Sequence, residues 1–284
     1  MPSPKLATLA IVTTLLLGLT ANVNAEELVQ FPSITYRLSD FQKARAKARG
    51  ESGENPPGLA IPGYLTKPDG TGRHPAVVVL HGCGGLGASH RQEAETIRSW
   101  GYVTLVPDSF TPRGMKDACV VERRDMAPRV EDAFGALAYL AKLPFVDPTR
   151  IAVVGYSHGG GVALRIAMHS RRGIYEMPDD LGFKAAAAYY PPCEIVSESL
   201  AIPTLILIGD KDDWTHAARC EAIAQRDAGK HLRLTLFPGV YHSFNFPVFK
   251  EPRQIYGHWS KFDEEATKRA TSELRDFLGK ELAQ

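Results

Sequence analysis

Short apolar runs alternate with amphipathic stretches along most of the chain. The runs lie at residues 58–65, 76–80, 102–106, 151–154, 184–189, 203–208 and 232–237. Several of them are continuously apolar, which is typical of parallel strands that are buried on both faces. The pattern therefore predicts seven strands, and a further edge strand is expected over Leu28–Leu38.

The stretches between the apolar runs have helical periodicity. In residues 128–143, for example, Val130, Phe134 and Leu137 recur at a spacing of three or four, and Pro128 suits a first helical turn. Strands and helices that follow one another in this way predict a doubly wound, mostly parallel sheet with helices on both faces. The other helices are expected at residues 89–100, 158–170, 215–227 and 263–282.

The first 25 residues have a different character. Lys5 precedes an uncharged apolar stretch, residues 6–19, and Val23-Asn24-Ala25 follows at the position that a signal peptidase reads. The stretch is shorter than the roughly 20 apolar residues that span a bilayer. We predict an export signal over 1–25, an N-terminal extension over 26–57 and one α/β domain over 58–284. The mature protein is expected in the periplasm or outside the cell, without stable membrane association; an uncleaved N-terminal anchor is the alternative.

Charge and cysteine content exclude some classes of partner. The full chain has 33 Lys and Arg against 32 Asp and Glu, and the predicted signal carries a single cation. A chain so nearly neutral has no general electrostatic footprint for nucleic acid, and the basic run at residues 42–50 is expected to be a solvated segment. Four cysteines in an exported chain favour disulfides. No Cys and His cluster has zinc-like spacing, so no metal is expected.

Ser157 occupies the turn between a predicted strand and a predicted helix. It lies within Gly155-Tyr156-Ser157-His158-Gly159, directly after the run at residues 151–154. This is the G-x-S-x-G pattern of a nucleophile elbow, in which a strained turn lifts the serine hydroxyl above the sheet. A simple glycine turn without catalytic function is the alternative.

An acid and a base follow two later strands. Asp212 comes after the run at 203–208 and His242 after the run at 232–237. Parallel strands end at the same edge of a sheet, so these side chains are expected to meet Ser157 there. The imidazole would take the serine proton, and the acid would orient the imidazole. Asp210 and Asp213 compete for the acid role, but the spacing from Gly209 favours Asp212.

A glycine-rich loop, "HGCGGLG" at residues 81–87, directly follows the run at 76–80. Its backbone N–H groups can turn inward to stabilise an oxyanion. We assign the two donors to the amides of Cys83 and His158, the second of which opens a helix. The His158 side chain is expected to point away from Ser157 and to line the pocket.

Three other residues are candidate substrate contacts. Arg113 either forms a structural ion pair or binds an anionic group of the substrate. Tyr190 and Trp214 follow predicted strands and are either pocket walls or core residues.

Five motifs together resemble the dienelactone hydrolase family of α/β-hydrolases. They are "HGCGGL", "GYVTLVPDSFTPRG", "DPTRIAVVGYSHGG", "LIGDKDDWT" and "YHSF". The resemblance implies a lidless α/β-hydrolase domain beyond residue 58, and hydrolysis of a small-molecule ester or lactone without a cofactor. It also implies a nucleophile–Asp–His triad. The name-giving enzymes use cysteine as the nucleophile; Ser157 stands at the matching position and favours a serine esterase.

The positions of the predicted strands and of the cysteines bear on the lid and on the disulfides. About a dozen residues separate the strands at 184–189 and 203–208, which leaves no room for a helical lid. Of the three possible disulfide pairings, we favour Cys83–Cys119 and Cys193–Cys220, because each would brace a loop at the active edge. A serine peptidase of the same fold and a non-catalytic binding protein are the alternative functions. The sequence carries no indication of the oligomeric state.

Overall fold

Eight strands form one sheet in the computed structural model, which describes residues 26–54, 57–120, 127–168, 175–178 and 180–283. The predicted export signal lies outside these residues. The order of strands across the sheet is β1-β2-β4-β3-β5-β6-β7-β8. Their bounds are β1 Glu27–Pro32, β2 Ala60–Thr66, β3 His74–Leu80, β4 Val103–Pro107, β5 Val146–Tyr156, β6 Ala185–Tyr189, β7 Thr204–Gly209 and β8 Leu232–Phe237.

The sheet is parallel from β4 to β8, as predicted. Only β2 reverses direction, because it pairs antiparallel with both β1 and β4. The inner strands are almost fully buried, as strands covered on both faces must be. The carboxyl ends of β3, β5, β6, β7 and β8 therefore share one edge of the sheet.

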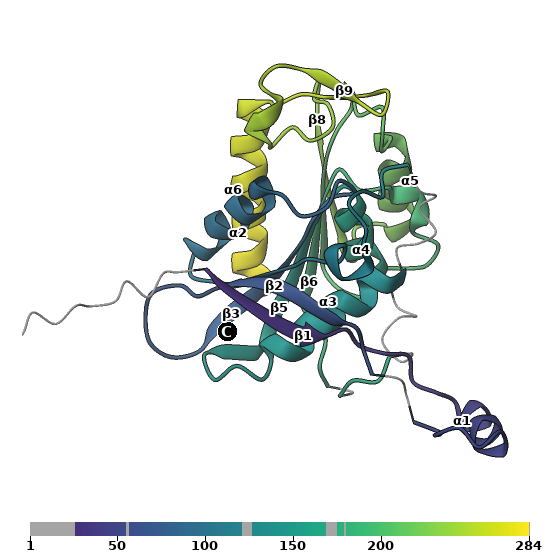
Figure 1. The fold of residues 1–284 in the computed structure, drawn as a ribbon. Coiled ribbons are helices and arrows are strands. Elements are labelled where there is room, and N and C mark those ends of the chain that lie inside the picture. The colour runs from purple at the N-terminus through teal and green to yellow at the C-terminus, as the bar shows by residue number, and fades with distance from the viewer. Residues whose placement is uncertain (1–25, 55–56, 121–126, 169–174, 179, 284) are drawn as a thin grey trace, which may run out of the picture.

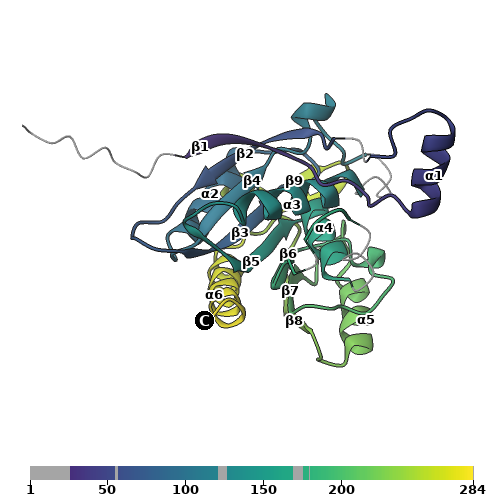
Figure 2. The same ribbon diagram turned by 90° about the horizontal axis from the view of Figure 1, so that it is seen from below.

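Helices cover both faces of this sheet (Figures 1 and 2). One face carries α2 (Ala88–Arg98) and α6 (Glu264–Glu281), and the other carries α3 (Ala127–Leu140), α4 (His158–Ala167) and α5 (Ala217–Asp227). The structure thus has the doubly wound arrangement of the α/β-hydrolase fold. Short 3-10 helices lie at Thr111–Arg113, Cys193–Ile195 and Pro247–Phe249.

The basic run lies on a helix that projects from the body of the molecule, α1 (Asp40–Ala48) (Figure 1). The helix begins with a capping box, in which Ser39 and Gln42 exchange hydrogen bonds between side chain and backbone. Most of its residues are exposed, in agreement with a solvated segment.

A small hairpin that the sequence pattern did not predict lies between β8 and α6. It consists of β9 (Arg253–Ile255) and β10 (His258–Ser260), and its turn residues Tyr256 and Gly257 both have positive φ. The Tyr256 hydroxyl donates to Asp117 at 2.5 Å, which ties the hairpin to the loop that carries Cys119. Figure 1 shows the hairpin beyond the carboxyl ends of the strands.

Two disulfides join Cys83 to Cys119 and Cys193 to Cys220, the pairing favoured above. The first connects the glycine-rich loop after β3 to the segment after β4. The second connects the residues on either side of β7. Each bridge therefore fixes a loop near the edge where the strands end.

The described residues contain neither a candidate membrane span nor a candidate metal cluster. No helix in this part of the chain has the length and apolarity needed to cross a membrane. Nor do these residues contain a group of three or more side chains that could hold a metal ion.

Candidate active site

Ser157 occupies a strained turn between β5 and α4. Its φ of 50° and ψ of −116° lie in a region that non-glycine residues rarely adopt. The turn needs glycine on both sides: a Cβ on Gly155 would lie 2.1 Å from the carbonyl oxygen of Gly159. A Cβ on Gly159 would lie 2.4 Å from the carbonyl oxygen of Leu80. The G-x-S-x-G pattern therefore has the steric basis of a nucleophile elbow.

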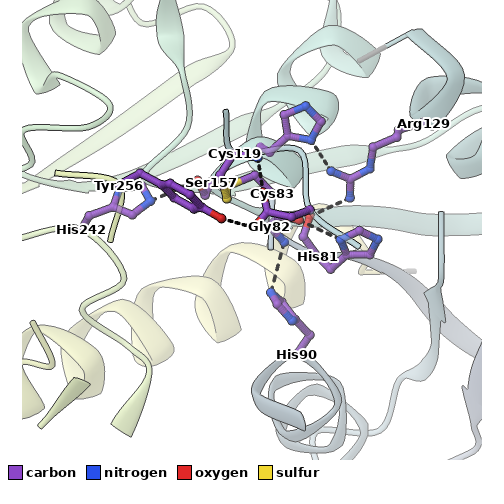
Figure 3. The surroundings of a disulfide bond; sticks show 11 residues. His81, Gly82, Cys83, His90, Cys119, Arg129, Ser157, His242 and Tyr256 are labelled. Carbon is purple, nitrogen blue, oxygen red and sulfur yellow. Dashed lines mark hydrogen bonds between the residues drawn. A yellow bond between two sulfur atoms is a disulfide. The ribbon is translucent and has the colours of Figure 1, made fainter. Parts of the chain in front are cut away.

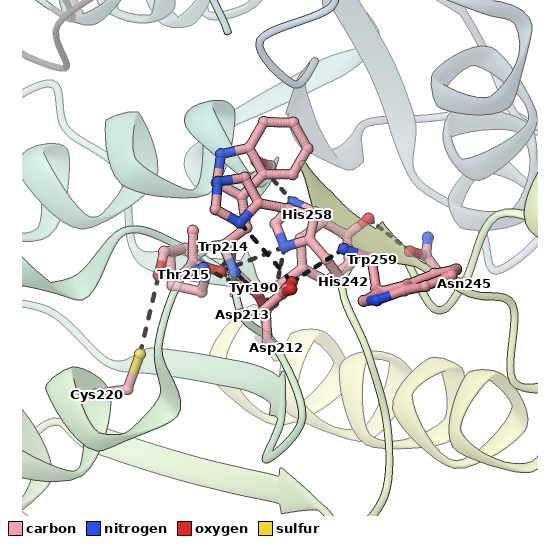
Figure 4. Close-up of polar contacts among 12 residues, drawn as sticks. Tyr190, Asp212, Asp213, Trp214, Thr215, Cys220, His242, Asn245, His258 and Trp259 are labelled. Carbon is pink, nitrogen blue, oxygen red and sulfur yellow. Dashed lines mark hydrogen bonds and ion pairs between the residues drawn. The ribbon is translucent and has the colours of Figure 1, made fainter. Parts of the chain in front are cut away.

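Ser157, His242 and Asp212 meet at the edge of the sheet. The Ser157 Oγ lies 3.0 Å from His242 Nε2, and His242 Nδ1 lies 2.7 Å from Asp212 Oδ2. Both His242 and Asp212 are buried, whereas Ser157 is partly exposed (Figure 4 shows the acid and the imidazole). This arrangement can move a proton from the serine hydroxyl to the imidazole, whose charge then faces the carboxylate.

The surroundings of Asp212 keep it ionised. The backbone N–H groups of Trp214 and Thr215 donate to its Oδ1 at 3.0 and 2.8 Å. Burial acts to raise the pKa of Asp212, but the facing His242 and these amide donors outweigh it, so that the pKa is lowered. The Thr215 hydroxyl lies 3.0 Å from Asp212 Oδ2 and 3.0 Å from the Tyr190 carbonyl oxygen. The Asp-x-x-Thr spacing of a local side-chain turn is the signal that would have found Thr215.

Tyr190 and Trp214 pack on the imidazole and also line the pocket. Their ring centroids lie 4.5 and 5.0 Å from that of His242. Tyr190 is fully buried and has a φ of 38° at the end of β6. Both residues thus form part of the cavity wall and also support the His242 ring (Figure 4).

The two residues whose amides were assigned to the oxyanion hole lie close to Ser157, one across the cavity lining and one next to it in the chain. Cys83 lines the same pocket as Ser157, and His158 is the first residue of α4. The His158 side chain does not line the pocket. Its Nδ1 instead contacts the guanidinium of Arg129, a residue of α3 that Figure 3 shows beside the glycine-rich loop.

A cavity of about 350 Å³ opens over Ser157. Its walls come from the glycine-rich loop, the segment after β8 and the hairpin, and none of the described lining residues is Asp, Glu, Lys or Arg. The apolar wall on the hairpin side was missed by the sequence pattern. It consists of Phe246, Val248, Phe249 and Ile255.

Arg113 lies away from this cavity. Its guanidinium donates to both carboxylate oxygens of Asp132, at 2.8 and 2.9 Å, and to the Ser109 carbonyl at 2.6 Å. Of the two roles that the sequence left open, these contacts favour the structural ion pair.

A polar cluster that the sequence pattern did not indicate lies beside the pocket. Glu93 on α2 accepts hydrogen bonds from Tyr156 Oη at 3.1 Å and from Asn245 Nδ2 at 2.8 Å. The Tyr190 hydroxyl donates to Asn245 Oδ1 at 2.6 Å. Burial raises the pKa of Glu93 to about 7, although both hydrogen bonds act to lower it.

Comparison with known proteins agrees with this architecture. The model of the dienelactone hydrolase family matches residues 61–282. A protein of Cupriavidus pinatubonensis named carboxymethylenebutenolidase 1 is 29% identical over 195 residues, which are 64% of this chain and 79% of that protein.

Two solved structures have the same fold. One is a dienelactone hydrolase-like promiscuous phosphotriesterase, P91, from metagenomic libraries, with a TM-score of 0.64, 17% identity and coverage of 90% and 99%. The other is the propionate-bound esterase Est2 of Thermogutta terrifontis, with a TM-score of 0.60, 20% identity and coverage of 79% and 91%. The family match spans nearly the whole described domain, and the chain belongs to the dienelactone hydrolase family of α/β-hydrolases.

Proposed function

We propose that this ester or lactone hydrolase uses Ser157 as its nucleophile, His242 as general base and Asp212 as the acid that orients the base. The single observation that carries the proposal is the continuous contact from Ser157 through His242 to Asp212, with distances of 3.0 and 2.7 Å. Serine needs this help, because its hydroxyl is a weak nucleophile until an imidazole takes its proton.

The reaction proceeds through an acyl-enzyme. The Ser157 oxygen attacks the ester carbonyl while His242 takes the hydroxyl proton, and the carbonyl oxygen becomes an oxyanion. The amides of Cys83 and His158 stabilise that charge. As the intermediate collapses, the C–O bond to the alcohol breaks and His242 returns the proton to it. Water, activated by His242, then attacks the acyl carbon, releases the acid and restores Ser157.

The lining of the pocket supports neutral substrates of moderate size. An anionic group would lose water without gaining a cationic partner among the described lining residues. The volume of about 350 Å³ accommodates a small acyl group together with its alcohol. In a lactone, the acyl group and the alcohol belong to one ring, and the same cavity can hold such a ring.

We also propose that the protein works outside the reducing cytoplasm. Two disulfides in a chain with no other cysteine support this location, since such bridges persist in oxidising compartments.

A substrate panel with one variant tests the proposed mechanism. The wild type should hydrolyse short-chain p-nitrophenyl esters and lactones but not peptide amides, and Ser157→Ala should lower kcat by at least about 1,000-fold. A fluorophosphonate should label Ser157. Ester turnover by Ser157→Ala would contradict the assignment of Ser157 as the nucleophile. Turnover of peptide amides alone by the wild type would favour a peptidase. Labelling without turnover of any ester or lactone would favour the binding-protein alternative.

A further inference from the structure

Arg129 is a buried cation that the proposed triad does not use. Its side chain comes from α3 and is 3% exposed. Nη2 donates to the His81 carbonyl at 2.6 Å, Nη1 contacts His158 Nδ1, and the guanidinium lies over the Phe110 ring. His81 opens the glycine-rich loop and His158 opens α4, so one guanidinium joins the two segments that carry the proposed oxyanion donors (Figure 3).

The contact with His81 fixes the direction of a peptide plane. The carbonyl of His81 and the N–H of Gly82 belong to one planar trans peptide and point in opposite directions. Arg129 holds the carbonyl side, and the Gly82 N–H donates to His90 Nε2 at 3.1 Å. Burial lowers the pKa of His90 to about 4, so its ring is neutral near pH 7 and can accept this bond. The first peptide of the loop is therefore held on both sides.

The next peptide carries the donor itself. His81 Nδ1 lies 2.8 Å from the Gly82 carbonyl oxygen, which can only accept, so this nitrogen carries the proton. Because the Gly82 carbonyl faces the His81 ring, the N–H of Cys83 points the opposite way. The aim of the Cys83 amide thus depends on the His81 backbone that Arg129 holds.

The His81 carbonyl, which Arg129 binds, lies against the start of α4. A Cβ on Gly159 would lie 2.5 Å from the His81 carbonyl oxygen, so helix and loop are in direct backbone contact. A shift of the loop relative to α4 would change the separation of the Cys83 and His158 amides. Arg129 contacts both sides of this junction.

We propose that Arg129 is a positioning residue that sets the spacing of the Cys83 and His158 amides in the oxyanion hole. The proposal rests on the proposed function, since it assumes an oxyanion formed by attack of Ser157. A planar guanidinium can bind two acceptors in fixed directions, whereas a lysine ammonium cannot reproduce that fork.

Kinetics of Arg129→Lys and Arg129→Met test the proposal. Misplaced donors weaken the transition state more than the bound ester, so kcat should fall about 10- to 100-fold in both variants while KM changes less than about threefold. The rate of fluorophosphonate labelling of Ser157 and the affinity for an alkylboronic acid should fall by similar factors, because both adducts place an oxygen against the same amides.

Arg150→Met is the matched control. Arg150 is a half-buried arginine, with its side chain 15% exposed and an ion pair to Asp147 at 2.8 Å. It lies on β5 but far along the strand from Ser157. This variant should keep kcat within about twofold, and thermal denaturation shows which variants are folded. If Arg129→Met does not fold, Arg129→Lys, which retains the buried charge, provides the test.

The outcomes separate the two proposals. Wild-type kcat and boronate affinity in folded Arg129→Lys would overturn the positioning role, even where Ser157→Ala is inactive. A second outcome would also overturn the proposal: a higher KM, a lower kcat and a lower stability, with an unchanged ratio of boronate affinity to substrate affinity. Arg129 would then be a structural residue only. Activity in Ser157→Ala would instead contradict the proposed function.

Discussion

Three aspartates lie within four positions after β7, and the fold gives each a different task. Asp210 accepts from the Gly239 N–H at 2.7 Å, and Asp213 accepts from the Trp259 N–H at 3.0 Å. Only Asp212 reaches His242 (Figure 4). The spacing from Gly209 pointed to Asp212, but the partners of the other two depend on the path of distant loops. Sequence alone therefore favoured one acid without excluding its neighbours.

Neutral substitutions at these positions should separate the acids. Asp212→Asn keeps the size of the side chain but removes the charge that orients His242, so kcat for a p-nitrophenyl ester should fall about 1,000- to 10,000-fold. Asp213→Asn, the matched change one residue later, should stay within about threefold of the wild type. The opposite ranking of the two variants in steady-state kinetics would move the acid role to Asp213.

At the scale of elements, the apolar runs located the strands of the sheet within a few residues. The predicted N-terminal strand was too long, since β1 ends at Pro32, where its partner β2 begins at Ala60 and offers no further pairing. The β9–β10 hairpin was missed because strands of three residues carry no usable alternation. Its position is set by tertiary contacts such as the one between Tyr256 and Asp117.

Glu93 shows how a helix takes part in the site without supplying a reacting group. It anchors α2 to Tyr156 at the end of β5 and to Asn245 in the loop that follows His242. No sequence pattern marks this residue, since it is one of several charged positions on an amphipathic helix. The contact forms only when α2, β5 and the loop after β8 are assembled.

Glu93 should make stability depend on pH. Its folded pKa of about 7 exceeds the ordinary value of 4.5, so between these values the folded state holds more protons than the unfolded state. The contribution of this group therefore declines as pH rises from about 4.5 to 7, by at most about 3 kcal/mol. Glu93→Gln does not titrate and should lack that decline.

Urea unfolding of wild type and Glu93→Gln at pH 5 and pH 8 measures the effect. The free energy of unfolding of the variant should rise relative to the wild type between the two pH values. A difference between the proteins that is the same at both pH values would show that Glu93 has an ordinary pKa in the folded state.

At the scale of the whole molecule, the sequence predicted the fold class, because apolar runs and helical stretches alternate along the chain. It also predicted the family and the disulfide pairing, because both depend on motifs and cysteines close to strand ends. The order of the strands was not predictable in the same way. β4 lies between β2 and β3, and this order is fixed by crossovers that place α2 on one face and α3 on the other. The buried arginine and the hairpin wall likewise depend on segments that meet only in the finished structure.

The two disulfides should differ in their effect on catalysis. Removal of either should lower the free energy of unfolding by about 2–4 kcal/mol. The Cys83–Cys119 bridge also braces the residue that carries a proposed oxyanion donor, so Cys83→Ser with Cys119→Ser should lower kcat about tenfold or more. Cys193→Ser with Cys220→Ser should change kcat less than threefold. Ester kinetics at a temperature where both double variants are folded compare them, and equal loss of kcat in both would contradict a local role for the first bridge.

The β9–β10 hairpin belongs to neither helical layer, yet it supplies part of the apolar wall over Ser157. Its strands pair with each other, and a single bridge joins Ser260 of β10 to His242. The hairpin therefore borders the substrate cavity and also contacts the proposed general base. A change at Ile255, which lines the cavity, can alter acyl selectivity, whereas a change at Ser260 also reaches the proposed proton-transfer residues.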